Sequence, residues 1–406
     1  MTNNTIDNNK ITVVDSIMGS GKTSWVINEI LNKNLSENIL YITPYLDETE
    51  RIRKRTIRQM KEPLNKGEGK IGNIAKLIRN QIDITSTHEL FRRFDDNCKQ
   101  ALVENDYILI LDETLTAVEP YHFNKKDDYT YLLQNKDISV KEDGLIEWTG
   151  ANLDTRYEDV RILAQSHCLF KVDEKFFLWH FPHEIFNLFK KVYVLTYLFS
   201  GSLMKYYFDL YNIHYETKSI KLIDNEYKLV DYYKPSKEEY KNRINIYQGK
   251  LNQNISQKEN MLSSSWCKYP YNKRDRKQLQ NNFYNFSRRL IGAGCKDIMW
   301  TTFKSCRKEL SKKGYANSFV ACNCRATNDY QDRTCLMYGV NWYTNPEITK
   351  FFAKRNIFID QADMALANML QWIWRSNIRV KDSSKVIDIY VPSIRMRKLL
   401  TDWLND

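Results

Sequence analysis

Short runs of consecutive apolar residues alternate, in the first half of the chain, with segments whose apolar residues recur every three or four positions. A continuous apolar run is typical of a strand buried on both faces, whereas the wider spacing is typical of an amphipathic helix. We therefore expect strands at residues 11–14, 38–43, 82–85, 107–111 and 191–196, and a basic helix at residues 47–60. Strands that alternate with helices predict a mostly parallel sheet.

The second half of the chain repeats this alternation. It predicts strands at residues 244–247, 297–302, 318–322, 334–338 and 385–391, and helices at residues 277–291, 303–313, 345–354, 362–377 and 393–404. The pattern predicts a second α/β domain of similar size. A chain of 406 residues is long enough for two or three domains.

Three segments fall outside the alternation. Residues 1–10 are rich in Asn and Thr and are expected to form a disordered tail. Residues 121–189 lose the regular pattern and predict an inserted subdomain, while the polar, Lys- and Tyr-rich residues 218–241 predict a linker. We accordingly expect the first domain at residues 11–217, with residues 191–196 as its last strand, and the second domain at residues 242–406.

The strongest chemical signal follows the first expected strand. Between that strand and the next helix the chain reads Met18, Gly19, Ser20, Gly21, Lys22 and Thr23. Phosphate binding needs inward backbone N–H groups, which glycines permit, a lysine for the β- and γ-phosphates, and a hydroxyl for Mg²⁺. The segment lacks only the first glycine of the full pattern, where Ser16 stands, and it predicts a P-loop that binds ATP. A plain Gly-Ser turn is the alternative.

A pair of acids, Asp112 and Glu113, ends the apolar strand at residues 107–111. Adjacent carboxylates at the end of a buried strand are costly unless they bind a metal or activate water. In nucleotide hydrolases the first acid holds Mg²⁺ and the second polarises the attacking water. We therefore expect Thr23 and Asp112 to bind Mg²⁺ and Glu113 to act in catalysis, an ordinary strand end being the alternative for such a pair in isolation.

With these two motifs the chain resembles the superfamily-2 helicases of the DEAD/DEAH-box-like class, most of all the small helicases of phages and mobile elements. The resemblance runs through most of the chain in the family's order: residues 18–23 are similar to motif I, 43–45 to Ia, 85–88 to Ib, 111–114 to II, 195–198 to III, 301–303 to IV, 325–330 to V and 371–379 to VI. Thr114 replaces the family's Ala in motif II, and Leu198 replaces a hydroxyl residue in motif III. The resemblance implies two tandem RecA-like P-loop NTPase domains with mostly parallel sheets and the nucleotide between them.

The segment similar to motif VI can also be argued physically. On a helix, Gln371, Arg375 and Arg379 lie four residues apart and share one face, so that two guanidinium groups could point at a γ-phosphate. Trp374 replaces the family's Gly and the last Arg lies one residue later, which leaves the identity of the arginine finger open. We prefer Arg375 with Arg379 in support. A solvated basic helix face is the alternative.

The net charge of +11, from 61 Lys and Arg against 50 Asp and Glu, favours a polyanionic partner. Residues 51–79 carry ten basic and two acidic side chains, and residues 268–313 carry thirteen and three, interleaved with aromatic residues. Basic grooves with aromatic platforms are typical of single-strand binding, and the resemblance places motifs Ia, Ib, IV and V on the nucleic acid. The expected contacts are Thr43, Pro44, Arg51, Arg55, Thr85, Ser86, Thr302, Lys304, Thr327 and Asn328.

Composition places the chain among globular proteins, with 27% charged and 42% hydrophobic residues. Eight cysteines without a C-x-x-C spacing are typical of reduced thiols in a cytosolic protein. His167, Cys168, His180 and His183 could bind zinc, but their many aromatic neighbours favour a core patch. The longest uncharged apolar stretch, residues 192–204, is shorter than the roughly 20 residues that span a bilayer, so we expect no membrane partner.

These observations predict an ATP- and Mg²⁺-dependent helicase or translocase on nucleic acid, with single-stranded or partly duplex DNA favoured and RNA retained as a candidate. The resemblance implies a role in phage or mobile-element replication or recombination, in the cytoplasm of a bacterial host, with other replication proteins as further candidate partners. Two alternatives stay open. One is a terminase-like DNA-packaging motor, and the other is a nucleic-acid-binding adaptor with a vestigial ATPase.

Overall fold

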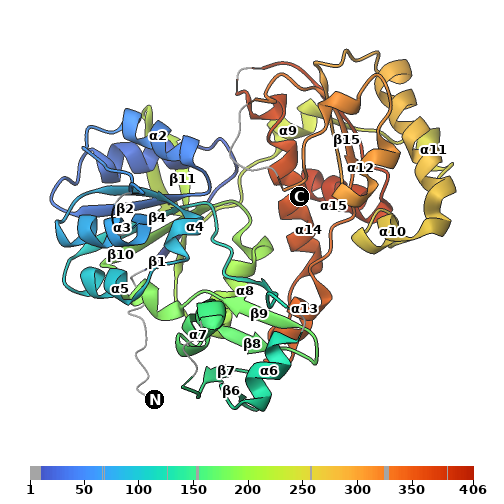
Figure 1. The fold of residues 1–406 in the computed structure, drawn as a ribbon. Coiled ribbons are helices and arrows are strands. Elements are labelled where there is room, and N and C mark those ends of the chain that lie inside the picture. Colours follow the sequence, from blue (N-terminus) through green and yellow to red (C-terminus); the bar gives the residue numbers. More distant parts are fainter. Residues whose placement is uncertain are drawn as a thin grey trace. The chain divides into compact units, whose positions relative to one another are not determined.

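The computed structural model describes residues 11–65, 67, 69–125, 127–151, 155–256, 258–323, 329–381 and 383–406 (Figure 1). Within these residues the chain forms two compact units. One contains residues 11–15, 22–231 and 345–359, and the other contains residues 16–21, 232–344 and 360–406. The expected tail, residues 1–10, lies outside the described residues.

A seven-stranded sheet in the order β12-β11-β1-β10-β4-β2-β3 forms the centre of the first unit. All neighbouring strands are parallel except β11 and β12, which are antiparallel. The strands are β1 (Ile11–Asp15), β2 (Asn38–Thr43), β3 (Ile84–Thr87), β4 (Tyr107–Asp112), β10 (Lys191–Thr196), β11 (Glu216–Ile223) and β12 (Glu226–Asp231). The strand β10 therefore separates β1 from β4.

Helices complete this core. They are α1 (Lys22–Trp25), its continuation η1 (Val26–Leu31), α2 (Leu46–Arg55), α3 (Gly69–Arg79), α4 (His88–Phe91), α5 (Asp96–Val103), η4 (Phe199–Gly201) and α8 (Leu203–Leu210). Val26, Ile30 and Leu31 of η1 pack with Val14 of β1 and Ile110 of β4 in one buried cluster. The apolar spacing of the first helix thus covers the strand that leads into the predicted P-loop.

The expected linker is wrong for residues 218–231, which form most of β11 and β12, and β10 is not the last strand of the sheet. The strand β11 is tied to β1 by side chains, because Thr12 Oγ1 donates to Glu216 Oε1 at 2.7 Å and Ser219 Oγ donates to the Asp15 carbonyl at 3.0 Å. The strand β12 forms the edge of this sheet, and edge strands carry charged residues that protect the open backbone. That polarity gave these residues the composition of a linker.

An inserted subdomain follows β4. It holds an antiparallel sheet in the order β5-β9-β8 and the hairpin β6-β7. Its elements are β5 (Val118–Tyr121), α6 (Asp128–Gln134), β6 (Ile138–Val140), β7 (Ile146–Trp148), η2 (Thr155–Tyr157), α7 (Glu158–Gln165), β8 (Leu169–Lys171), β9 (Phe177–His180) and η3 (His183–Leu188).

The distant helix α13 (Pro346–Ala353) belongs to the same unit as this subdomain. The ring centroids of Phe351 and Phe170 are 5.6 Å apart, and Lys354 Nζ donates to the Val172 carbonyl at 3.2 Å. The expectation that all of residues 242–406 form the second domain is therefore wrong for residues 345–359.

The second unit is built on a parallel sheet in the order β13-β16-β15-β14. Its strands are β13 (Ile244–Ile246), β14 (Ile298–Thr302), β15 (Cys335–Gly339) and β16 (Ile387–Tyr390), and its helices are α9 (Glu238–Arg243), η5 (Lys250–Asn252), α10 (Ser264–Lys268), η6 (Pro270–Asn272), α11 (Lys273–Tyr284), η7 (Asn285–Leu290), α12 (Lys304–Leu310), η8 (Ala316–Ser318), α14 (Gln361–Ile373), η9 (Asn377–Arg379) and α15 (Ile394–Asn405). A core around Phe283, Trp300 and Met337 joins the sheet to α11. The strand expected at residues 318–322 is wrong, because only Phe319 forms a bridge, with Trp300.

The fold class is confirmed: two α/β units with mostly parallel sheets, and an inserted subdomain in the first. Among the described residues, no helix combines the length and apolar character needed to cross a bilayer.

His180 lies in an aromatic cluster of the subdomain, as the aromatic interpretation of the histidine and cysteine group expected. Its ring centroid is 4.5 Å from that of Phe170, and Tyr211 Oη lies 3.0 Å from its Nε2 atom. Burial lowers the pKa of His180 from 6.5 to about 4, with His183 and Arg355 acting in the same direction. The ring is therefore neutral in the folded protein at pH 7.

This burial predicts acid sensitivity. A histidine with a lowered folded-state pKa contributes its full stability above its unfolded pKa of 6.5, and the contribution is lost as the pH falls towards 4. We expect wild type to lose roughly 2 kcal/mol of unfolding free energy from this source between pH 7 and pH 5. His180→Phe should show a correspondingly smaller loss in urea titrations, whereas His122→Phe, at an exposed position of the same unit, should follow wild type. An unchanged pH slope in His180→Phe would contradict the assignment.

Candidate nucleotide and nucleic-acid site

The predicted P-loop joins β1 to α1, and its glycines adopt backbone angles that other residues avoid. Gly19 has φ +84° and Gly21 has φ +99°. A Cβ atom at Gly19 would meet nothing within 4 Å, so it is the backbone conformation rather than space that requires glycine there. The Ser20 Oγ atom is buried and has no hydrogen-bond partner among the described residues. A buried donor of this kind suits a loop that receives phosphate oxygens.

Asp15 is the last residue of β1 and was not expected as a site residue. Its carboxylate accepts hydrogen bonds from the backbone N–H groups of Leu198 and Phe199, both at 2.9 Å. Burial raises the pKa of Asp15, while these two bonds and the nearby Lys22 act to lower it. The carboxylate thus ties the strand before the P-loop to the turn that follows β10. An acid at the end of a β-branched strand was the available sequence signal.

Leu198 departs from the motif III pattern in its side chain but adopts a special backbone conformation. Its φ is +53°, in the left-handed region, which residues other than glycine rarely adopt. The bond from its N–H to Asp15 holds this conformation. Leu198 therefore contributes to this turn through its backbone N–H group rather than through its side chain.

The acidic pair lies at the same sheet edge as Asp15. In the strand registers Asp15 pairs with Thr196, and Leu195 pairs with Asp112, so the carboxyl ends of β1, β10 and β4 coincide. Ligands of open parallel sheets bind at this edge. The structure therefore brings Lys22 and Thr23, which begin α1, to the same edge as Asp112 and Glu113.

Tyr41, on β2, is a second residue that the sequence did not reveal. Its Oη donates to Asp112 Oδ2 at 2.9 Å. Burial and then the neighbouring Glu113 raise the pKa of Asp112 to about 6, and the Tyr41 hydrogen bond opposes this shift. The tyrosine therefore favours the ionised carboxylate that a Mg²⁺ ligand must be.

Glu113 has φ +71°, again left-handed for a residue that is not glycine. Its N–H donates to the Leu195 carbonyl at 3.0 Å. Strained backbone at a strand end is concentrated at functional sites, where the surrounding contacts determine the direction of the side chain. Glu113 is held in this conformation at the end of β4, next to Asp112.

The first-unit residues predicted to bind nucleic acid lie at the ends of β2 and β3. Thr43 Oγ1 donates locally to the Tyr45 carbonyl at 2.8 Å, and Pro44 is half-buried. The hydroxyls of Thr85 and Ser86 are buried and have no partner among the described residues. A pocket of about 190 Å³ lies beside them, lined by Leu46, Glu62, Pro63, Lys70, Ser86, Thr87, Glu89, Leu90 and Arg93.

Acidic neighbours occupy much of the basic cluster at residues 51–79. Arg51 pairs with Glu48, Arg53 with Glu62, Lys54 with Glu50 and Arg58 with Asp83. Arg55 is exposed, with one Nη atom 3.5 Å from Ser24 Oγ on α1. Once these neighbouring acids are included, the net positive charge around this segment is smaller than the count over residues 51–79 suggests.

In the second unit, Thr302 ends β14 and Lys304 begins α12 with an exposed side chain. The hydroxyls of Thr301 and Thr302 are buried without a partner among the described residues. Thr327 and Asn328, predicted from motif V, lie outside the described residues.

The expected helix face of motif VI is wrong. The helix α14 ends at Ile373, so Gln371 is helical, Arg375 lies in the following turn and Arg379 ends the short helix η9. Arg375 is 6% exposed, and Arg379 is half-buried. A residue far away in the sequence holds this segment, because Arg243 donates to the Asn377 carbonyl at 2.8 Å and to the Val380 carbonyl at 3.1 Å. The structure thus groups these three residues in the second unit without a common helix face.

Comparisons with known proteins identify relatives over the whole chain. The YonV middle domain matches residues 118–179 and the YonV C-terminal Rossmann-like domain matches residues 238–404. The SPbeta prophage-derived protein YonV of Bacillus subtilis (strain 168) is 38% identical over 416 residues, covering 98% of this chain and 99% of that protein. Among solved structures, Xpd4 of S. tokodaii is 13% identical with a TM-score of 0.47, covering 97% of this chain and 94% of that one. An XPD helicase is 12% identical with a TM-score of 0.46, covering 98% and 95%.

The contacts of Arg58 predict a structural role inside the basic cluster. Its side chain is buried, bonds both Asp83 oxygens at 2.7 and 2.8 Å, and donates to the Leu31 and Glu37 carbonyls. Arg58→Met leaves the Asp83 carboxylate without its ion-pair partner, with only the Ile39 N–H as donor among the described residues, and removes the side-chain donor of these carbonyls. We expect it to lower the unfolding free energy by about 3 kcal/mol in urea titrations. The matched control Lys54→Met breaks an exposed pair and should leave the unfolding free energy at the wild-type value. Normal stability combined with weakened DNA binding in Arg58→Met would instead place this arginine on the nucleic acid.

Proposed function

The chain belongs to the YonV family, and we propose that this member is an ATP-dependent helicase or translocase that acts on nucleic acid. The observation that carries the proposal is the P-loop between β1 and α1 together with the acidic pair that ends β4, at one edge of a parallel sheet. This combination provides phosphate binding and water activation at one place.

The donor set fits a Mg²⁺-nucleotide. A carboxylate and a hydroxyl are the hard oxygen ligands that Mg²⁺ prefers, and Asp112 and Thr23 supply one of each. Held by these two residues, Mg²⁺ would supply positive charge that offsets the negative charge of the phosphates. In this proposal Lys22 binds the β- and γ-phosphates, the buried Ser20 hydroxyl faces a phosphate oxygen, and Glu113 orients the attacking water.

Nucleic acid is supported as the partner by the net charge and by the pocket at the end of β3. Lys70 and Arg93 line this pocket together with Ser86, whose hydroxyl could donate to a backbone phosphate. Glu62 and Glu89 also line it, and Arg93 pairs with Glu89, so Lys70 is the cation that we expect to meet the phosphate. We favour DNA, in single-stranded or partly duplex form, and a role in replication or recombination inside a bacterial host, because the matched relative is prophage-derived. RNA is the second substrate to be tested.

Arg375, Arg379 and Gln371 are proposed to act at the γ-phosphate from the second unit. Because Arg375 and Arg379 do not share a helix face, each arginine must be tested separately. This geometry also favours a second candidate function, a nucleic-acid-binding adaptor whose ATPase is vestigial.

The proposed roles of Lys22 and Glu113 predict the effect of their substitution on ATP hydrolysis. Lys22→Ala should remove phosphate binding and Glu113→Gln should remove water activation, and each should lower the ATPase kcat by roughly a hundredfold or more. A coupled assay of phosphate release measures this. Lys33→Ala and Glu104→Gln, at exposed positions on the same unit, are matched controls and should retain wild-type rates. Wild-type turnover in Lys22→Ala would refute the assignment.

Measurements of ATP turnover and strand displacement distinguish the helicase or translocase from the adaptor. We expect single-stranded DNA to stimulate ATP turnover, and ATP to drive strand displacement on partial duplexes with a 5′ or a 3′ tail. Parallel substrates made of RNA identify the preferred nucleic acid. Nucleic-acid binding without any turnover, in the presence or absence of DNA, would favour the adaptor.

A further inference from the structure

Two tyrosines of the second unit form a stacked pair on the surface. The ring centroids of Tyr269 and Tyr271 are 5.2 Å apart with an interplanar angle of 14°. Tyr271 is 75% exposed, the highest value for a tyrosine in the part of the chain that the structure describes, and Tyr269 is 48% exposed. Aromatic pairs in a core usually meet edge to face, as Phe283 and Trp300 do in the same unit. The tyrosine pair instead leaves broad ring surface in water.

The backbone beneath the pair is held firmly to the unit. Pro270 stands between the two tyrosines and opens the short helix η6, where its ring fixes φ. Arg276 Nη1 donates to the Tyr269 carbonyl at 2.8 Å, and its Nε donates to Glu309 at 2.6 Å. The Asn272 side chain donates to the carbonyl of the buried Trp266 at 2.9 Å. The rings are therefore presented by an ordered turn, which lowers the entropy cost of binding a ligand.

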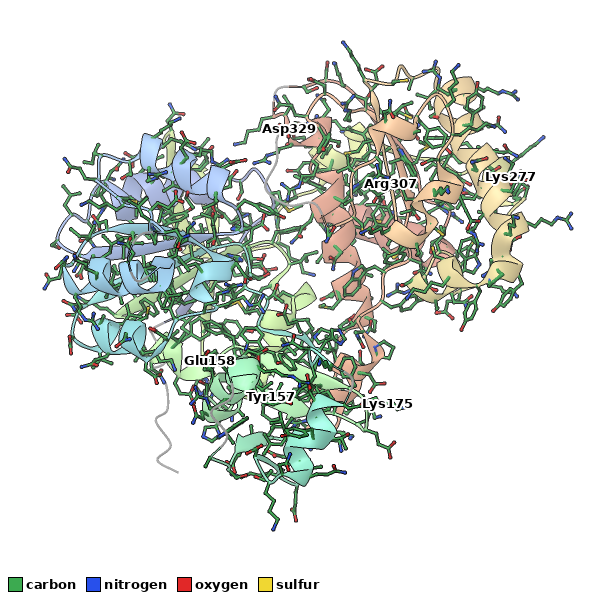
Figure 2. The ribbon with its side chains drawn as sticks, viewed as in Figure 1. Tyr157, Glu158, Lys175, Lys277, Arg307 and Asp329 are labelled. Atoms are coloured by element: carbon green, nitrogen blue, oxygen red, sulfur yellow. The ribbon has the colours of Figure 1, made fainter. Side chains whose placement is uncertain are left out.

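Exposed cations surround the pair on one stretch of chain. They are Lys268 before it and Lys273, Arg274 and Lys277 on the helix α11 that follows, and Figure 2 labels Lys277 on this helix. Within the described residues, Lys268, Lys273 and Arg274 make no ion pair. One acid, the half-buried Asp275, lies among them on α11, and the nearby Glu309 pairs with Arg276. The surface thus keeps its positive charge, in contrast to the paired arginines of α2.

We infer that Tyr269 and Tyr271 form a base-stacking platform for single-stranded nucleic acid, with the flanking cations on its phosphates. An exposed π-face beside unpaired Lys and Arg matches a nucleobase attached to a phosphate, and it does not match the interior of a duplex, where base faces are covered. The platform deepens the proposed function, since it gives the second unit a binding site outside the residues similar to the helicase motifs.

The test measures binding rather than hydrolysis. The full-length chain without nucleotide is titrated against fluorescein-labelled oligothymidine, oligouridine and a blunt DNA duplex, and fluorescence anisotropy is recorded. Tyr269→Ala/Tyr271→Ala should weaken single-strand binding about ten- to a hundredfold and leave duplex binding within about twofold. Tyr269→Trp/Tyr271→Trp should restore it, because stacking needs only an aromatic face. Equal weakening with oligothymidine and oligouridine indicates a platform that does not distinguish DNA from RNA. Weakening with one of the two oligonucleotides alone indicates a platform that does, and either result supports the inference.

A matched control comes from the inserted subdomain. Tyr131 is also exposed and stacked, 5.8 Å from Tyr157, and Tyr131→Ala should bind as wild type does. Lys273→Gln/Arg274→Gln should reduce the slope of log affinity against log salt by roughly one to two. Unchanged single-strand binding in the double alanine variant, or an equal loss for single strand and duplex, would overturn the inference. If the wild-type chain hydrolyses no ATP and the double alanine variant loses single-strand binding, the proposed ATPase is refuted and the platform is supported.

Discussion

The carboxylate of Asp15 is the interaction on which the nucleotide edge of the first unit depends. It is buried, and it accepts the N–H groups of Leu198 and Phe199 while Lys22 lies within electrostatic range. Because β10 stands between β1 and β4, fixing the exit of β10 to the end of β1 also fixes the P-loop strand relative to the acidic pair. Loss of this acceptor would leave two backbone donors unsatisfied in a buried turn, which is costly.

The same edge stores backbone strain in two residues that are not glycine. Leu198 and Glu113 both have positive φ at the exits of neighbouring strands, and each is compensated by a hydrogen bond from its own N–H. Such conformations persist only where other contacts over-determine them. Asp15 supplies that contact for Leu198, and the Leu195 carbonyl supplies it for Glu113. The direction of the Glu113 side chain therefore follows from sheet geometry rather than from local sequence preference.

Predictability from the sequence follows the burial of each element. The runs that became β1, β2, β4 and β10 were correctly predicted because strands buried on both faces are continuously apolar. The edge strand β12 and its neighbour β11 were mistaken for a linker because their residues are largely charged and polar, as is typical near a sheet edge. The end of α14 could not be predicted from the sequence, because apolar residues continue through Trp374 and Ile378. The turn that follows is held by Arg243, which is more than a hundred residues away in the chain. Tyr41 and Asp15 were missed for the same reason: their partners are distant in the chain.

The distribution of positive charge also depends on contacts that a sequence window does not show. Counting residues 51–79 omits Glu48, Glu50 and Asp83, which lie just outside that range and pair with Arg51, Lys54 and Arg58. A cation that is already paired with an acid neutralises a phosphate less well, so it releases fewer of the counterions that are condensed on the nucleic acid. Lys268, Lys273 and Arg274, near Tyr269 and Tyr271 in the chain, make no ion pair within the described residues, so each can neutralise a phosphate. The exposed Glu309 carboxylate is paired with the buried Arg276, and the unpaired cations argue for a larger contribution of the second unit to the affinity for a polyanion.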